Sequence, residues 1–150
     1  MSVGRICQRD VDLADLDESA WAAAERMHQR SVGSLIVLNE NRQPIGIVTD
    51  RDLVINVLAH EKEPRTTRVR EIMTAPIKTI GEDAGIETAL SLMRSGEFRR
   101  MPVVDREGRL VGVLSLDDVL TLLAEEFAEI GHLLDRQTPR AAAESTTRTP

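Results

Sequence analysis

The stretches GIVTDRDLV (residues 46–54) and GVLSLDDVL (residues 112–120) share one pattern and lie 66 positions apart. In each, a glycine and apolar residues lead to a hydroxyl residue, and an aspartate follows three positions later. The 66-residue offset extends without a gap over residues 3–58, and most aligned pairs keep their hydrophobic or polar character. Self-similarity of this kind is typical of two copies of one supersecondary unit.

Hydrophobic periodicity orders the two copies in the same way. The first copy predicts a strand near Val11, a helix over residues 19–30, strands over 35–38 and 45–49, and a helix to about residue 59. The second predicts a strand over 76–80, a helix over 85–96, strands over 100–105 and 109–115, and an amphipathic helix from 116. The expected fold class is therefore α/β (α+β), with two β-α-β-β-α repeats.

On this basis the chain divides into five segments. The first repeat covers residues 3–60 and the second covers 69–125, and a polar, proline-containing linker at 61–68 joins them. The last helix continues as an extension over 126–137. Residues 138–150 are small, polar and proline-bearing, which predicts a disordered tail because such a segment has little to bury.

Composition excludes several classes of protein. The net charge of −6 disfavours a nucleic-acid backbone as partner, and an aromatic content of 2% disfavours base stacking on aromatic side chains. Cys7 is the one cysteine, which excludes an internal disulfide or a paired-thiolate zinc site and predicts a semi-buried apolar role. The sequence lacks both an apolar run of roughly 20 residues and a signal-peptide core, so we expect a cytoplasmic protein without membrane contact.

The repeated phrase places Thr49 and Ser115 where a strand ends and a helix begins. Free amide groups and the helix dipole favour an anion at such a corner. Asp52 and Asp118 lie three residues further on, where a carboxylate can accept two hydrogen bonds from a vicinal diol such as that of ribose. The same spacing also matches a helix capping box, which has no ligand. The two roles can coexist.

Both halves resemble the cystathionine-β-synthase (CBS) domain. The resemblance rests on GIVTDRDL and GVLSLDDVL, on VREIMT before the second copy and on FRRMPVVD within it. It implies that the repeats pack around a pseudo-two-fold axis and form two clefts. In the family these clefts bind adenosine-containing ligands such as AMP, ADP, ATP or S-adenosylmethionine, and the module reports ligand status to an enzyme, a channel or another partner.

The resemblance also implies roles for individual residues. Thr49 and Asp52 would serve one cleft and Ser115 and Asp118 the other, with the aspartates on ribose and the hydroxyls on ribose or phosphate. Adenine would lie between aliphatic side chains near Val11 and Ile77. The candidates for phosphate contacts are Arg51, Arg99 and Arg100, each of which has the alternative of being a solvated surface arginine. Because the two copies differ at several of these positions, the two clefts are expected to differ in affinity.

The leading hypothesis is a regulatory ligand-sensing module without cofactor, metal or catalytic activity, because no catalytic triad, phosphate-binding loop or metal-ligand spacing is present in the sequence. Its expected partners are an adenosine-containing small molecule, a second copy of the chain and an effector protein that the sequence does not identify. The helices at 19–30 and 85–95 are the predicted homodimer surface. The alternative is a ligand-independent dimerisation or interaction scaffold.

Overall fold

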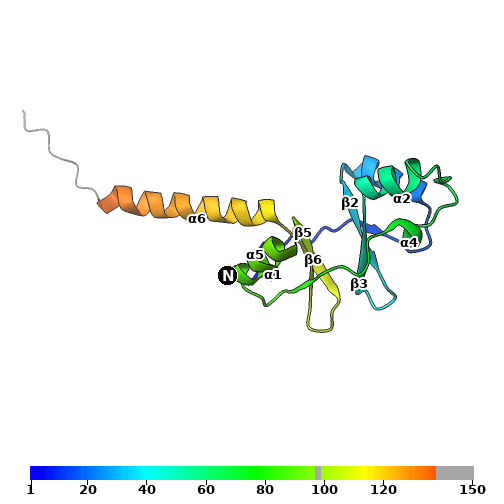
Figure 1. Ribbon diagram of the computed structural model, residues 1–150. Helices are drawn as coiled ribbons and strands as arrows, with labels where there is room; N and C mark the ends of the chain where they lie inside the picture. The colour runs from blue at the N-terminus through cyan, green and yellow to red at the C-terminus, as the bar shows by residue number, and fades with distance from the viewer. Residues whose placement is uncertain (97–98, 138–150) are drawn as a thin grey trace, which may run out of the picture.

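The computed structural model describes residues 1–96 and 99–137, and it consists of two β-α-β-β-α units (Figure 1). This confirms the predicted fold class. Each unit has a three-stranded sheet, in the order β1-β2-β3 or β4-β5-β6. The strands are β1 (Leu13–Ala14), β2 (Ser34–Leu38), β3 (Pro44–Thr49), β4 (Ile80–Gly81), β5 (Arg100–Val104) and β6 (Leu110–Ser115). The helices are α1 (Val3–Ile6), α2 (Ala20–Arg30), α3 (Asp50–Asp52), the π-helix η1 (Leu53–Leu58), α4 (Val69–Ile72), α5 (Ile86–Gly96) and α6 (Leu116–Gln137).

The two sheets have the same register. Leu35 lies opposite Val48 in the first antiparallel pair, and Met101 lies opposite Leu114 in the second, as the 66-residue offset requires. Both pairs also have an irregularity between the last two residues of β2 and of β5. All four opposed side chains are fully buried, so the repeated hydrophobic pattern specifies the register of both sheets.

The first strand of each repeat begins after the predicted position. Val11 precedes β1 and Ile77 precedes β4, and both residues lie in irregular segments rather than in strands. In the second repeat, Pro76 has no N–H group to donate to a neighbouring strand. In both repeats, only two residues pair in parallel with the central strand.

Each repeat is completed by a short helix from the other. Helix α1 opens the first repeat, yet its Val3 belongs to the second core together with Met93 and Leu114. Helix α4 opens the second repeat, yet its Val69 and Ile72 belong to the first core. In Figure 1, α1 accordingly lies beside α5, and α4 lies near β3. The sequence pattern places each segment in its own repeat and does not predict the exchange.

Backbone hydrogen bonds hold the exchanged segments in place. The Gln8 amide donates to Val113 O and the Val113 amide donates to Gln8 O, each over 2.9 Å. The equivalent pair joins Ile47 and Thr74 over 3.0 and 2.8 Å. The last strand of each repeat therefore gains a neighbour from the segment that opens the other repeat, and the two repeats interlock.

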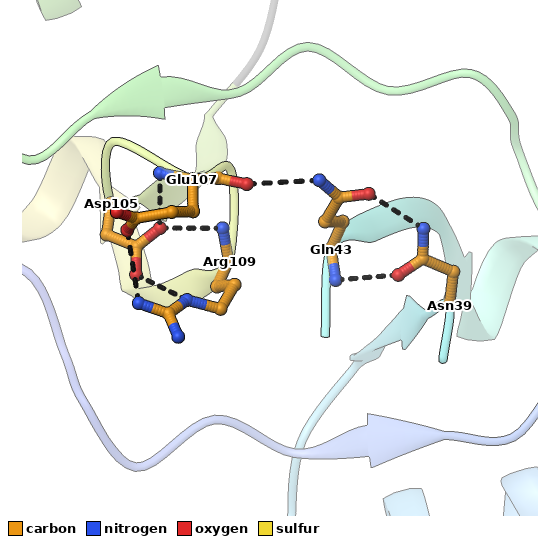
Figure 2. Close-up of polar contacts among 5 residues, drawn as sticks. All are labelled: Asn39, Gln43, Asp105, Glu107 and Arg109. Carbon is orange, nitrogen blue, oxygen red and sulfur yellow. Dashed lines mark hydrogen bonds and ion pairs between the residues drawn. The ribbon is translucent and has the colours of Figure 1, made fainter. Parts of the chain in front are cut away.

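The hairpin turns of the two repeats also meet (Figure 2). Gln43 Nε2 in the first turn donates a hydrogen bond to the Glu107 carbonyl oxygen in the second, over 3.0 Å. The side chains of Asn39 and Asp105 organise the two turns alike, because each accepts from the amide four residues further on, over 2.9 Å. This turn-to-turn contact is a second connection between the repeats.

Helix α6 begins on the second core and then leaves it. Val119 in its first turns is fully buried, whereas every residue from Leu123 to Gln137 is exposed. Figure 1 shows α6 extending away from both sheets. The tail predicted for 138–150 lies outside the described residues. Thr67, in the segment predicted as a linker, is buried, and its carbonyl accepts from the Ala20 amide over 2.8 Å.

Candidate ligand-binding cleft

A cleft of about 350 Å³ lies between the two repeats. Its size falls within the range of roughly 300–1,000 Å³ that is usual for small-molecule sites. The first repeat supplies aliphatic and acidic side chains, and the second supplies the hydroxyl and carboxylate of the repeated phrase. The lining residues are Gln8, Asp10, Val11, Asp12, Val32, Ser34, Ile36, Arg100, Val113, Ser115 and Asp118.

The polar corner of the cleft is built by Ser115 and Asp118 at the start of α6. Asp118 Oδ2 accepts from the Ser115 amide over 2.9 Å and from the Ser115 hydroxyl over 2.7 Å. The Ser115 hydroxyl in turn accepts from the Asp118 amide over 3.1 Å. This is the arrangement of a helix capping box, and it leaves Oδ1 as the carboxylate oxygen that serves other partners.

The second oxygen of Asp118 meets a residue that the sequence analysis missed. Gln8 Nε2 donates to Asp118 Oδ1 over 3.2 Å, and Gln8 also lines the cleft. Gln8 is 110 residues away in the chain and reaches this point only because the segment after α1 crosses to the second repeat. No spacing or periodicity in the sequence marks it.

Asp118 is held in its charged form. Burial raises the pKa of the Asp118 carboxyl, but hydrogen bonds from Ser115 and Gln8 and the nearby Arg100 guanidinium lower it by more. The pKa of Asp118 therefore lies below its ordinary value. An ionised carboxylate accepts hydrogen bonds and donates none, which suits a ligand with hydroxyl groups.

Two further carboxylates, also missed from sequence, lie across the cleft on the segment before β1. Asp10 and Asp12 both line it, and both pair with Arg30 of α2. The Arg30 Nε to Asp12 Oδ1 distance is 2.7 Å, and the Arg30 Nη2 to Asp10 Oδ2 distance is 3.0 Å. The Asp12 side chain is 15% exposed and that of Asp10 is 87% exposed, so Asp12 is the more shielded from water.

The structure brings four of the nine predicted site residues together in this cleft: Val11, Arg100, Ser115 and Asp118. Val11 comes from the first repeat and the other three come from the second, so the cleft is shared between repeats. The remaining five do not line it: Thr49, Arg51, Asp52, Ile77 and Arg99.

The first copy of the phrase forms the same capping box at the start of α3. Asp52 Oδ2 accepts from the Thr49 amide over 2.9 Å, and Thr49 Oγ1 accepts from the Asp52 amide over 3.1 Å. Both side chains are partly buried, and Ile77 is half-buried. Arg51 and Arg99 are exposed.

Comparison with known proteins identifies the family of the two repeats. The family model of the CBS domain matches residues 3–59 and 69–125. The chain belongs to the CBS-domain family. Uncharacterized protein MK0525 of Methanopyrus kandleri is 39% identical to this CBS-domain pair over 120 residues, which are 80% of this chain and 61% of the relative. The chain thus spans less than two thirds of that relative's length.

Solved structures of CBS-domain pairs superpose on this one. The CBS domain pair of protein MJ0100, in complex with methylthioadenosine and S-adenosylmethionine, has a TM-score of 0.72 and 25% identity. The match covers 84% of this chain and 98% of that one. CBSX2 in complex with AMP has a TM-score of 0.70 and 25% identity, over 83% of this chain and 96% of that one.

Within residues 1–96 and 99–137, no group of three or more histidine, cysteine or acidic side chains is placed to hold a metal ion. In the same part of the chain, no helix combines the length and the apolar character needed to cross a bilayer.

Proposed function

We propose that this CBS-domain pair is a regulatory module that binds an adenosine-containing ligand in the cleft between its repeats. The observation that carries the proposal is the ionised Asp118 carboxylate at one end of a cleft with aliphatic walls. A ribose diol would donate to Asp118, and adenine would lie against Val11, Val32 and Ile36. The ligands named for the two CBS-domain structures, AMP in one and methylthioadenosine with S-adenosylmethionine in the other, support this class of ligand.

The position of the cleft suggests how binding would be signalled. Its walls come from both repeats, so a ligand that fills it contacts both and favours one relative arrangement of the two sheets. A ligand shifts such an equilibrium only by its preference for one arrangement. Gln8 lies at the junction, because it bonds Asp118 through its side chain and Val113 through its backbone. The signal would pass to a separate effector protein, without catalysis by the module.

The proposal includes a second site at the first copy of the phrase. Thr49, Asp52 and Ile77 correspond to Ser115, Asp118 and Val11 through the 66-residue offset. Arg51 and Arg99 are exposed and are candidates to contact a phosphate that projects from either site.

Isothermal titration with adenosine, methylthioadenosine, S-adenosylmethionine, AMP and ATP tests the proposal. We expect saturable binding of at least one of these and its loss from the cleft in Asp118→Ala. Because Asp118 also caps α6, the matched control is Glu71→Ala, which removes the carboxylate that accepts from the Arg68 amide at the start of α4. The control should lose similar stability and keep the ligand. Absence of heat with all five compounds would refute the proposal.

An exposed apolar surface favours the second candidate function, self-association without ligand. A groove of about 500 Å³ on α2 and η1 is lined by Trp21, Val54 and Leu58, among others, and these three side chains are exposed. On α6, the exposed residues Leu123, Phe127, Ile130 and Leu134 form a stripe on one face. Helix α5, the other predicted dimer surface, has no exposed large apolar side chain among its described residues. We therefore place the homodimer contact on α2, η1 and α6.

Sedimentation equilibrium separates the two functions. A scaffold would dissociate in Phe127→Glu or Leu58→Glu and would be insensitive to adenosine compounds. His132→Glu, on the opposite face of α6, is the matched control and should leave association unchanged. A wild-type chain that stays monomeric at micromolar concentration would contradict the scaffold.

A further inference from the structure

We infer that the cleft at Ser115 and Asp118 selects adenosine compounds without a negatively charged 5′ group, either uncharged ones or cationic ones such as a sulfonium. The inference rests on the proposed function and specifies the ligand class of one of the two sites. It follows from the charges that surround the cleft.

The lining of the cleft has an excess of negative charge. It includes three carboxylates, those of Asp10, Asp12 and Asp118, and one guanidinium, that of Arg100, which leaves −3 + 1 = −2. Arg30 lies behind Asp10 and Asp12 and pairs with both, and even its inclusion leaves −1. Asp118 contributes in full at neutral pH, because its pKa lies below the ordinary value.

The corresponding segment of the second repeat, before β4, lacks these two carboxylates. The offset of 66 residues relates Asp10 to Pro76 and Asp12 to Lys78. Two negative side chains are thus replaced by one neutral and one positive, a difference of three charges. Any phosphorylated ligand would favour the site at Thr49 and Asp52, and the site at Ser115 and Asp118 would be left to ligands without phosphate.

The size of the effect follows from Coulomb's law. Two unit charges about 8 Å apart in an open, water-filled cleft with an effective dielectric constant of about 60 change a dissociation constant roughly threefold. A phosphate dianion makes four such pairs with the excess of two charges on the lining, and two pairs if Arg30 is counted, so the expected penalty for AMP relative to adenosine is on the order of 10- to 100-fold at low salt. Salt screens the penalty, so it shrinks at high ionic strength. Adenosine has no net charge, and its affinity should change little with salt.

Amide NMR titration of the full chain tests the inference site by site. The Val11 and Ser115 signals report this cleft, and the Thr49 signal reports the other site. With adenosine and AMP as probes, we expect the Val11 and Ser115 signals to shift at an adenosine concentration roughly 10- to 100-fold lower than that of AMP. In Asp10→Asn/Asp12→Asn the ratio should fall at least tenfold. Asp83→Asn, which removes one negative charge from an exposed residue outside the cleft and so matches Asp10→Asn alone, should leave the ratio at the wild-type value.

The outcomes separate the two proposals. If adenosine shifts the Val11 and Ser115 signals and AMP shifts them at equal concentration, the selectivity is refuted and the proposed function stands. A ratio that the double variant leaves unchanged also refutes it. If neither probe shifts any cleft signal, the selectivity is refuted, and the proposed function fails with it only if the isothermal titration also shows no binding of any of the five compounds. If the double variant folds poorly, Asp10→Asn alone serves the same test, because the Asp10 side chain is exposed. The expected fall in the AMP-to-adenosine ratio is then smaller.

Discussion

The glycine that opens each repeated phrase provides a quantitative test of the exchanged segments. A Cβ atom added at Gly112 would lie 2.5 Å from the Gln8 carbonyl oxygen and 2.8 Å from Cys7 Sγ. Contacts this short force the crossing segment away from β6. We therefore expect Gly112→Ala to break the two hydrogen bonds between Gln8 and Val113, each of which is 2.9 Å long.

The expected loss of stability can be worked from these contacts. Two backbone hydrogen bonds contribute about 1 kcal/mol each, and displacement of Cys7 from the second core adds about 1 kcal/mol or more. Replacing glycine by alanine restores about 0.5 kcal/mol through the unfolded state. The net destabilisation is about 2–3 kcal/mol, which lowers the Tm of a chain of this size by roughly 5–10 °C.

Thermal and urea unfolding followed by circular dichroism measure this change. Gly81→Ala is the matched control, because a Cβ atom there has nothing within 4 Å. Gly46→Ala should fall between the two, since its nearest neighbour, at 2.7 Å, is the flexible Met73 Sδ and the nearest backbone atom is 3.1 Å away. If Gly112→Ala proved as stable as Gly81→Ala, the crossing of the segment after α1 onto β6 would be refuted.

Three further predictions concern single side chains. The pKa of the Asp118 carboxyl is lowered on folding, so the stability that it contributes is present above its unfolded pKa of about 3.9 and is lost as the pH falls through its folded pKa. In Asp118→Asn, the urea-unfolding midpoint should therefore depend less on pH in this acid range than it does in the wild type. A pH dependence parallel to that of the wild type would count against the lowered pKa. Burial raises the pKa of the Cys7 thiol, so this thiol should react slowly in the folded chain. Mass spectrometry should show alkylation by iodoacetamide near pH 8 to be at least tenfold slower in the native chain than in urea, and equal rates would exclude the burial. Gln43→Ala removes the hydrogen bond to the Glu107 carbonyl and should lower the free energy of unfolding by about 1 kcal/mol. It should also speed hydrogen exchange of the nearby Leu110 amide, which donates to the Arg42 carbonyl. Unchanged exchange would show that the contact between the turns does not stabilise them.

The order and register of the elements follow from local pattern. Leu35 with Val48 and Met101 with Leu114 are apolar pairs at a fixed offset, and a slip by one residue would turn each strand's apolar face to water. The hydroxyl and aspartate at the start of α3 and α6 are also local, because a capping box needs only residues three positions apart. These features were therefore accessible to prediction.

The cleft is different in kind, because its walls are far apart in the chain. Gln8, Asp10 and Asp12 face Asp118 only because the segment after α1 crosses to the second repeat, and that crossing is driven by burial of Val3 in a core more than seventy residues away. The hydrophobic periodicity of the sequence does not predict such a long-range contact. Hydrophobic spacing and capping chemistry thus specified the two repeats, whereas long-range packing decided which side chains share a cleft and with what charge.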